Sequence, residues 1–436
     1  CTLIYSRRPC EQSWAAEGIE LSFHSMYLFF LLLAAALSDR SVGVRFGKER
    51  SGVVGHHVKF RRHVKRVSYN LTVQPENRTV HFDSIFSGQP TRVDWNAEVD
   101  NCISTPHGHR KFRQSKLVAP QMQEHFAAIM RKTAPFRNCT VHSYGGYSGP
   151  WIENLWIDEI MNALNLTNDI RHLFPGGVVP LLIQWTDCRL EMRNNFSTKL
   201  WRLFELYLRK DVLYVTVSQH DTGIFPSHLK LWNIFTFSAG GYGHVPIPLL
   251  SYRPPVLSHL CGGIGERQCT YSSSFMGQTK FGTSRRLFRR AVLGIDDPSI
   301  KCCGKTVKWL EVLANSSIAL CPRGYGRSSF RLYESIQMGV LPLYIYDDIE
   351  WLPYAGTHAH LTSFGFSVNV SDLASELERL KFALSPKEVT ERRKLMLSFV
   401  SSHYTLSGVI EQIITYIRYG TSVSDLRCST LPSTNQ

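Results

Sequence analysis

The first half of the chain alternates short apolar runs with longer amphipathic stretches. The apolar runs are rich in β-forming residues and continuous, at 141–144, 178–185 and 211–220. The segments around them have apolar residues at helical spacing, at 121–132, 150–164 and 199–209. Continuous apolar strands that alternate with helices predict a parallel α/β sheet covered by helices on both faces.

The second half repeats this pattern after a stretch that is dense in Gly and Pro, over 238–255 and 261–265. Strands are predicted at 272–276, 317–321 and 340–346, and helices at 284–293, 334–338, 373–384 and 409–417. Because Gly and Pro at this density indicate a linker or an active-site loop, we expect two α/β blocks joined near residue 262.

One loop in the second block carries recognisable chemistry. Pro322 ends a predicted strand, and Arg323, Gly324 and Arg327 follow before the Ser328 and Ser329 hydroxyls at the start of the next helix. A glycine-rich loop that leads into a helix N-terminus is suited to anions, because free N–H groups and the positive end of the helix dipole point into it. Two guanidinium groups add bidentate phosphate donors.

Glu334 lies about one turn into the same helix. A carboxylate there could accept hydrogen bonds from both hydroxyls of a ribose, and the carboxyl ends of parallel strands are where nucleotides bind in such sheets. The alternative is a turn with a structural role only. The loop lacks the Gly-Lys-Ser/Thr of a P-loop, so a Walker-type NTPase is not predicted.

The block over 322–343, with Pro-Arg-Gly, then Ser-Phe-Arg and Glu334, resembles the exostosin-type glycosyltransferases, glycosyltransferase family 47. The segments 273–278 and 284–290 and the helix over 372–384 are similar as well. The likeness is looser in the first half, at 147–156, 217–223 and 240–249, and it covers roughly 135–420 overall.

The resemblance implies a GT-B fold: two facing Rossmann-like domains with parallel sheets and a cleft between them. It also implies transfer of a sugar from a nucleotide sugar, with inversion, in the Golgi or the endoplasmic reticulum. Carried over to this sequence, the residues implied in donor binding are Arg285, Arg323, Gly324, Arg327, Ser328, Ser329, Arg331 and Glu334.

Three residues are candidates for the base that takes the acceptor proton: Asp221, His220 and Glu153. Each has a structural alternative, because His220 could be an ordinary loop histidine and Asp221 a turn or helix-capping residue. We expect no metal cofactor, since Asp347 and Asp348 lie at the end of a strand without the spacing of a DxD motif. Trp151, Trp156, Trp351 and Tyr354 could stack on sugars or belong to the core.

The chain has 436 residues, 49 Lys+Arg and 35 Asp+Glu, for a formal net charge of +14. About half of that excess lies in residues 45–66, which hold eight basic residues and one acidic residue. The interpretations are a solvated stem or attraction to acidic glycans or an anionic membrane. Nucleic acid is not an expected partner.

Residues 26–37 form an apolar run of 12, against the roughly 20 residues needed to span a bilayer. It resembles the apolar part of a signal peptide; a short signal-anchor and a buried helix are the alternatives. Asn-x-Ser/Thr sequons, in excess of chance, occur at Asn70, Asn77, Asn138, Asn165, Asn195, Asn315 and Asn369.

Eleven cysteines fit an oxidising lumen with two to four disulfides. Cys261 and Cys269 bracket a short loop and could pair, whereas we expect the adjacent Cys302 and Cys303 to pair elsewhere or stay free. No Cys-x-x-Cys pair supports a zinc site.

The domains predicted are a leader with a signal peptide or signal-anchor (1–44), a basic stem and irregular region (45–114), an acceptor-side Rossmann-like domain (115–262) and a nucleotide-sugar domain (263–436). The function predicted is a membrane-associated or secreted glycosyltransferase of the Golgi that uses a nucleotide sugar, with UDP as the expected nucleotide, on a glycan or glycoprotein acceptor. A non-catalytic glycan-binding or chaperone-like relative is the alternative. A glycoside hydrolase is disfavoured because it needs no diphosphate site.

Overall fold

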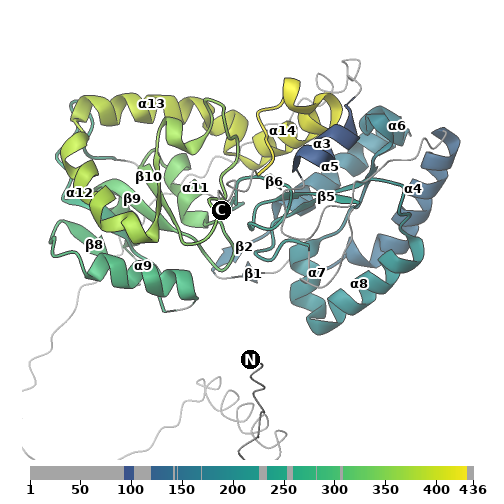
Figure 1. Cartoon of the computed structure of the whole chain (residues 1–436), viewed down its shortest axis with the longest axis horizontal. Helices are drawn as coiled ribbons and strands as arrows, with labels where there is room; N and C mark the ends of the chain where they lie inside the picture. The colour runs from purple at the N-terminus through teal and green to yellow at the C-terminus, as the bar shows by residue number, and fades with distance from the viewer. Residues whose placement is uncertain are drawn as a thin grey trace, which may run out of the picture. The chain divides into compact units, whose positions relative to one another are not determined.

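Two parallel β-sheets form the framework of the computed structural model (Figure 1). It describes residues 93–102, 119–140, 143–144, 146–167, 169–224, 233–252, 259–280, 282–304 and 308–429, all within one unit that spans Asn77–Gln436. We call the part built on the first sheet, over 119–252, the N-terminal lobe, and the part built on the second, over 259–403, the C-terminal lobe.

The sheet of the N-terminal lobe has four strands, β3 (Val179–Pro180), β4 (Tyr214–Ser218), β5 (Ile234–Ser238) and β6 (Val245–Pro246), paired in that order. The helices of this lobe are α4 (Ala119–Thr133), α5 (Ile152–Thr167), α6 (Ile170–Leu173), α7 (Trp185–Met192) and α8 (Asn194–Tyr207). Strands β4 and β5 are buried at every position, as expected for strands covered on both faces.

The sheet of the C-terminal lobe has five parallel strands in the order β11-β10-β9-β7-β8. They are β7 (Tyr271–Phe275), β8 (Ile300–Cys302), β9 (Ser316–Pro322), β10 (Leu341–Tyr346) and β11 (Phe366–Asn369). The helices are α9 (Thr283–Leu293), α10 (Trp309–Ala314), α11 (Phe330–Gln337), α12 (Leu373–Ala383) and α13 (Pro386–His403). Gly339 ends the turn after α11 with a φ of +80°, a conformation that favours glycine.

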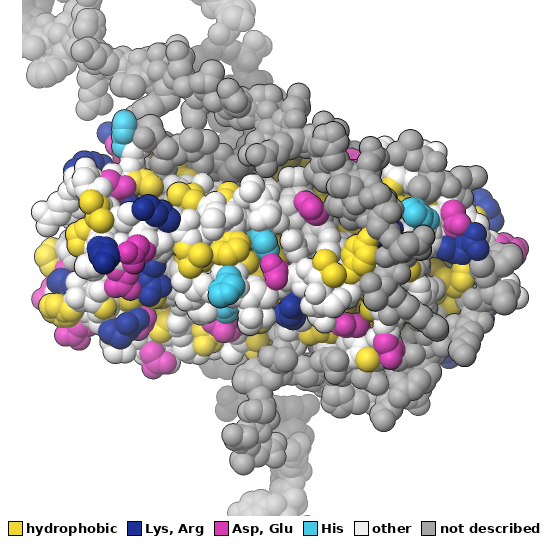
Figure 2. Space-filling view, turned by 90° about the horizontal axis from the view of Figure 1, so that it is seen from above, with side chains coloured by type: hydrophobic (Ala, Val, Ile, Leu, Met, Phe, Trp, Pro, Cys, Tyr) yellow, Lys and Arg dark blue, Asp and Glu magenta, His cyan; other side chains and the backbone are white. Residues whose placement is uncertain are grey.

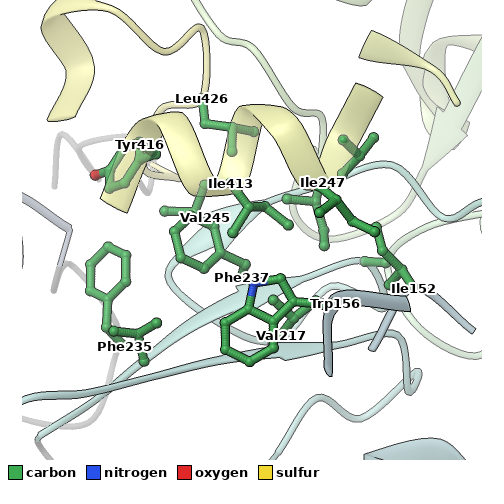
Figure 3. Close-up of a cluster of buried hydrophobic side chains, with 14 of the residues drawn as sticks. Ile152, Trp156, Val217, Phe235, Phe237, Val245, Ile247, Ile413, Tyr416 and Leu426 are labelled. Carbon is green, nitrogen blue, oxygen red and sulfur yellow. The ribbon is translucent and has the colours of Figure 1, made fainter. Parts of the chain in front are cut away.

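The last helix, α14 (Leu406–Tyr419), returns to the N-terminal lobe. Figure 3 shows its Ile413 and Tyr416 facing Phe237 and Val245 of the first sheet, and the rings of Phe237 and Tyr416 lie 5.4 Å apart. Burial of this apolar face ties the end of the chain to the first lobe.

A short helix, α3 (Trp95–Cys102), also belongs to the folded part. Trp95 is 2% exposed and contacts Phe235 and Tyr416, and Cys102 forms a disulfide with Cys428. The range 45–114, predicted to be a stem and irregular, therefore contains a folded helix. Its buried residues Trp95, Val99 and Cys102 follow helical spacing over only two turns, a pattern too short to indicate the helix.

The remaining elements are short. Strands β1 (Ser143–Tyr144) and β2 (Tyr147–Ser148) form an antiparallel hairpin. The 3₁₀ helices are η1 (Ala134–Phe136), η2 (Pro175–Gly177), η3 (Leu361–Ser363), η4 (Val370–Asp372) and η5 (Gly420–Ser422). The run at 141–144 was therefore wrongly predicted as a strand of the parallel sheet, because its described residues are exposed and pair only within the hairpin.

The predicted fold class is confirmed: α/β, with two Rossmann-like lobes and parallel sheets. The helices and strands predicted in the second block all form, with ends shifted by a few residues. The sequence analysis did not predict the strands β5, β6, β8 and β11 or the helices α6, α7 and α10. The predicted boundary near residue 262 falls between β6 and β7, which belong to different sheets.

The described cysteines form four disulfides: Cys102–Cys428, Cys139–Cys188, Cys261–Cys269 and Cys302–Cys303. The pairing of Cys261 with Cys269 is confirmed. The expectation for Cys302 and Cys303 was wrong, because these neighbours bond to each other. Cys303 has a φ of 79°, which turns the chain directly after β8 and brings the two side chains together.

The apolar run at 26–37, the basic segment at 45–66 and two sequons, Asn70 and Asn77, lie outside the described residues. Within the described residues, no helix is long and apolar enough to span a membrane. Figure 2 shows basic and acidic side chains interspersed on one face of the molecule, and pairs such as Arg392–Glu388, at 2.9 Å, contribute to the surface charge pattern.

Candidate functional site

A cavity of about 890 Å³ lies between the two lobes. The N-terminal lobe lines it with Tyr144, Tyr147, Asp221, Gly240 and Leu249. The C-terminal lobe lines it with Phe275, Met276, Gly277, Gln278, Arg285, Trp309, Gly324, Tyr325, Gly326, Ser328, Ser329, Phe330 and Arg331. The cleft expected of a GT-B fold is therefore present. The loop over 323–329, which we call the donor loop, forms part of its wall.

The donor loop, between β9 and α11, is held by hydrogen bonds among its own residues. The Gly324 N–H donates to the Ser328 carbonyl at 2.7 Å, and Arg323 Nε donates to the Gly326 carbonyl at 2.9 Å. Ser329 is the N-cap residue of α11, yet its hydroxyl makes no capping bond. The helix N-terminus at the cavity wall thus keeps N–H groups and a hydroxyl available to a ligand.

Two guanidinium groups, of Arg285 and Arg331, line the same wall. Arg285 lies 4.9 Å from the ring centroid of Phe275, and its Nε donates to the Arg323 carbonyl. Burial, with Arg331 as a second cause, lowers the pKa of Arg285 to about 10. Among the described residues, no carboxylate forms an ion pair with Arg285. A half-buried cation beside a like charge is a site that an anion would stabilise.

Arg331 lies 4.1 Å from the ring centroid of Trp309, and its Nε is 3.2 Å from Glu334 Oε2. Glu334 itself is 5% exposed. Burial raises the pKa of Glu334, while Arg331 and a hydrogen bond with Tyr147 oppose the shift. The wall therefore presents the guanidiniums of Arg285 and Arg331, whereas Glu334, predicted to hold the ribose, is buried next to the wall and does not line the cavity.

The other two predicted phosphate ligands, Arg323 and Arg327, do not line the cavity. The Nη1 of Arg323 lies 2.9 Å from Asp347 Oδ1 and also contacts Asp348. Arg327 Nε lies 2.9 Å from Asp348 Oδ2. Both guanidiniums are thus already neutralised, which is a correction to their predicted place. The cause is that the carboxyl ends of the adjacent strands β9 and β10 meet at one edge of the sheet.

Of the three candidate bases, Asp221 alone lines the cavity. Its side chain is 25% exposed, and burial raises its pKa while Arg189 opposes the shift. His220 Nδ1 lies 3.0 Å from Asp221 Oδ1 and accepts the Thr222 N–H at 3.1 Å. Burial, and then Arg189, lower the pKa of His220 to about 3, so it is neutral at pH 7. The geometry favours Asp221 as the proton acceptor.

Glu153 is fully buried and lies outside the cavity wall. Its carboxylate accepts the backbone N–H groups of Thr186 and of Gln219, the latter at 2.8 Å. Burial raises its pKa to about 8. Glu153 therefore supports the turn that carries Asp221 from behind, without reaching a ligand in the cavity.

The four aromatic residues considered for sugar stacking are also buried: Trp151, Trp156, Trp351 and Tyr354 are at most 2% exposed and do not line the cavity. The aromatic side chains that do line it are Tyr144, Tyr147, Phe275, Trp309, Tyr325 and Phe330. Sequence reasoning did not single these out, nor Arg189. Four of the aromatic residues, Tyr147, Phe275, Tyr325 and Phe330, lie within the segments at 147–156, 273–278 and 322–343 that resemble the glycosyltransferase family, which was the signal available for them.

Comparison with known proteins adds little. No family model matches the sequence, and no curated protein matches it. Among solved structures, the one titled "Crystal Structure of TarM" aligns with 50% of this chain and 52% of that chain, at 10% sequence identity and a TM-score of 0.27. This chain thus spans about half of that structure, and a likeness of this size carries no argument. The resemblance to exostosin-type glycosyltransferases stays a prediction.

Proposed function

We propose that the protein is a glycosyltransferase that moves a sugar from a nucleoside diphosphate sugar, with UDP as the expected nucleotide, to a glycan or glycoprotein. The observation that carries this proposal is the pair of cavity-lining guanidiniums, Arg285 of α9 and Arg331 in the first turn of α11, of which only Arg331 has a carboxylate partner among the described residues. A diphosphate would supply the missing negative charge. The exostosin-type resemblance of the surrounding motifs supports the same donor.

In the proposed reaction, the acceptor hydroxyl attacks the anomeric carbon from the face opposite to the diphosphate, which inverts the configuration. Negative charge grows on the leaving diphosphate, and Arg285, Arg331 and the N–H groups of α11 stabilise it. Asp221 accepts the proton of the attacking hydroxyl from the other side of the cavity. The Ser328 and Ser329 hydroxyls, both on the cavity wall, are proposed to donate to phosphate oxygens.

We propose that this chemistry needs no metal ion. Asp347 and Asp348, the adjacent acids that could suggest a DxD motif, are occupied by Arg323 and Arg327, and Asp347 Oδ2 also accepts from the Ser284 hydroxyl at 2.6 Å. A divalent cation would have to displace these partners. Activity in excess EDTA is the expected outcome.

The Golgi and the wider secretory pathway are the proposed location. Four disulfides among the described residues support an oxidising compartment, and exposed sequons support a glycoprotein. A membrane anchor or a cleaved leader at 26–37 remains part of this proposal, together with the exostosin-type family.

The test is to incubate the purified full chain with a panel of nucleotide sugars and to measure release of the nucleoside diphosphate, while UDP and GDP are tested separately for thermal stabilisation. We expect one nucleotide to raise the melting temperature and one sugar donor to be consumed. Stabilisation without turnover on any acceptor would favour the non-catalytic relative. If neither nucleotide shifts the melting temperature at millimolar concentration, the proposal fails.

A further inference from the structure

Arg327 lies in the donor loop but points toward the N-terminal lobe. Its backbone N–H donates to the Gly240 carbonyl at 2.8 Å, and its Nη1 donates to the Gly241 carbonyl at 3.1 Å. Its guanidinium also lies 4.5 Å from the ring centroid of Tyr242. A single residue of the C-terminal lobe thus contacts three successive residues of the other lobe.

The chain segments at this contact touch backbone to backbone. A Cβ on Gly240 would lie 1.9 Å from the His220 carbonyl oxygen, and a Cβ on Gly326 would lie 2.0 Å from the Gly240 carbonyl oxygen and 2.8 Å from that of Asp221. No side chain other than hydrogen fits at these positions. The donor loop therefore contacts the turn at Gly240, and that turn contacts the turn that carries Asp221. Because these contacts are tight, a shift of one segment moves the next.

The charge of Arg327 is already balanced inside the C-terminal lobe. Its Nε pairs with Asp348 Oδ2 at 2.9 Å, and its carbonyl accepts the hydroxyl of Tyr344. The side chain is 19% exposed and does not line the cavity. A phosphate would have to replace Asp348, whereas Arg285 needs no such exchange.

We propose that Arg327 is a positioning residue that holds the two lobes together and sets Asp221 at its distance from the anion site. This inference rests on the proposed function for the role of Asp221, while the contact between the lobes can be tested without it. A misplacement of about 1 Å between reacting groups can reduce turnover roughly 100-fold, so a residue away from the substrate can control the rate.

The test compares Arg327→Ala, Arg327→Lys and Asp348→Asn with the cavity variant Arg285→Ala. Three quantities are measured: the Kd for UDP by calorimetry, kcat with the donor and acceptor found active, and amide hydrogen exchange over 233–244. For Arg327→Ala we expect the Kd within about twofold of wild type, kcat lower by about tenfold or more, and faster exchange at 238–243.

The conservative variants separate charge from geometry. Arg327→Lys keeps the charge but cannot hold Asp348 and the Gly241 carbonyl together, so we expect an intermediate kcat. Asp348→Asn removes the ion pair and should change exchange in the same direction by a smaller amount. For Arg285→Ala we expect UDP affinity to fall by about tenfold or more, with exchange at 238–243 unchanged.

Two results would overturn the inference. If Arg327→Ala loses UDP affinity as much as Arg285→Ala, Arg327 is a phosphate ligand. If exchange over 238–243 and kcat both stay at wild-type values, the contact does not position anything. Absence of UDP and GDP binding by the wild type would instead contradict the proposed function, and the exchange experiment would still decide whether Arg327 joins the lobes.

Discussion

Tyr147 and Phe330 stack on each other at the wall of the cavity, with ring centroids 3.9 Å apart and ring planes inclined by 18°. Tyr147 comes from the β1–β2 hairpin on the N-terminal side, and Phe330 is the first residue of α11. The Tyr147 hydroxyl also hydrogen bonds to Glu334. The Tyr147 hydroxyl therefore takes up the carboxylate that would hold the ribose of the proposed donor. When the donor binds, the ribose hydroxyls must replace the Tyr147 hydroxyl as hydrogen-bond donors to Glu334.

Removing that hydroxyl should strengthen nucleotide binding. In Tyr147→Phe, the stack with Phe330 remains, but Glu334 no longer gives up a hydrogen bond when a ribose arrives. One hydrogen bond is worth about 1 kcal/mol, so we expect UDP affinity to increase by about fivefold, measured by calorimetry. Tyr144→Phe, on the same hairpin, is the matched control and should bind UDP like the wild type. Weaker binding by Tyr147→Phe would show that the hydroxyl contacts the nucleotide instead.

Glu334→Ala should weaken UDP binding by about tenfold while the fold stays intact, because the ribose loses its acceptor. The sharper comparison uses UDP and its 2′,3′-dideoxy analogue. The wild type should prefer UDP, and Glu334→Ala should bind both alike if the carboxylate holds the ribose hydroxyls. Glu378→Ala, an exposed residue on α12, serves as the control. An unchanged preference for UDP in Glu334→Ala would remove Glu334 from the site.

The alternation of the longer strands and helices and the place of the anion loop could be predicted from the sequence, because apolar periodicity and glycine positions determine them locally. The short strands β6, β8 and β11 could not, because so few residues show no period. The pairing of Arg323 with Asp347 was also within reach, since adjacent parallel strands end at one edge. The position of Tyr147 was not, because it depends on how closely the two lobes approach. The same holds for Arg327, whose partners lie 86 residues away in the chain.

Asp221→Asn should abolish most of the turnover and leave UDP binding unchanged. A positioned base contributes roughly 100- to 10,000-fold, so kcat should fall by about that factor. Equal losses in kcat and in UDP affinity would argue that Asp221 contacts the donor and is not the base.

Arg189→Gln tests the electrostatics around the same carboxylate. Arg189 lowers the pKa of Asp221 against the effect of burial, and it donates a hydrogen bond to Thr222. Without this cation the Asp221 pKa rises, so the base stays protonated to a higher pH. We expect the acidic limb of the kcat profile to move to higher pH. A limb that stays in place would show that another group controls it.

Glu153 should make the protein less stable as pH rises from about 4.5 to about 8. Its pKa is about 8 in the folded protein, above the 4.5 of the free side chain, so the folded state holds a proton that the unfolded state releases. Its contribution to stability is present below pH 4.5 and is lost as pH rises through 8. His220 and His244, whose pKa values burial lowers to about 3 and about 4, act in the opposite direction but only below about pH 6.5.

Urea unfolding between pH 6.5 and 8 isolates the Glu153 effect. The free energy of unfolding should fall by up to about 1.4 kcal/mol per pH unit in the wild type. Glu153→Gln cannot ionise and should show a flatter profile, whatever its absolute stability. Glu205→Gln, an exposed site on α8, should keep the wild-type slope. A wild-type profile that is flat in this window would mean that Glu153 stays ionised in the fold.

The described sequons should differ in occupancy when the protein is made in a secretory host. Asn138, Asn165 and Asn195 are exposed, so an attached glycan meets water. Asn315 is half-buried and its Nδ2 donates to the Glu311 carbonyl at 2.6 Å, while Asn369 Oδ1 accepts the Ser371 N–H at 3.0 Å.

We expect glycans on the three exposed sites and little on Asn315 and Asn369, measured by mass spectrometry after enzymatic deglycosylation in heavy-oxygen water. Gln replacements at the three exposed sites should each remove one glycan from the intact mass. Occupancy at Asn315 would show that the hydrogen bond from its Nδ2 to the Glu311 carbonyl does not form in the fold. A chain without a glycan at any of these sites would contradict passage through the secretory lumen, and with it the proposed location of the enzyme.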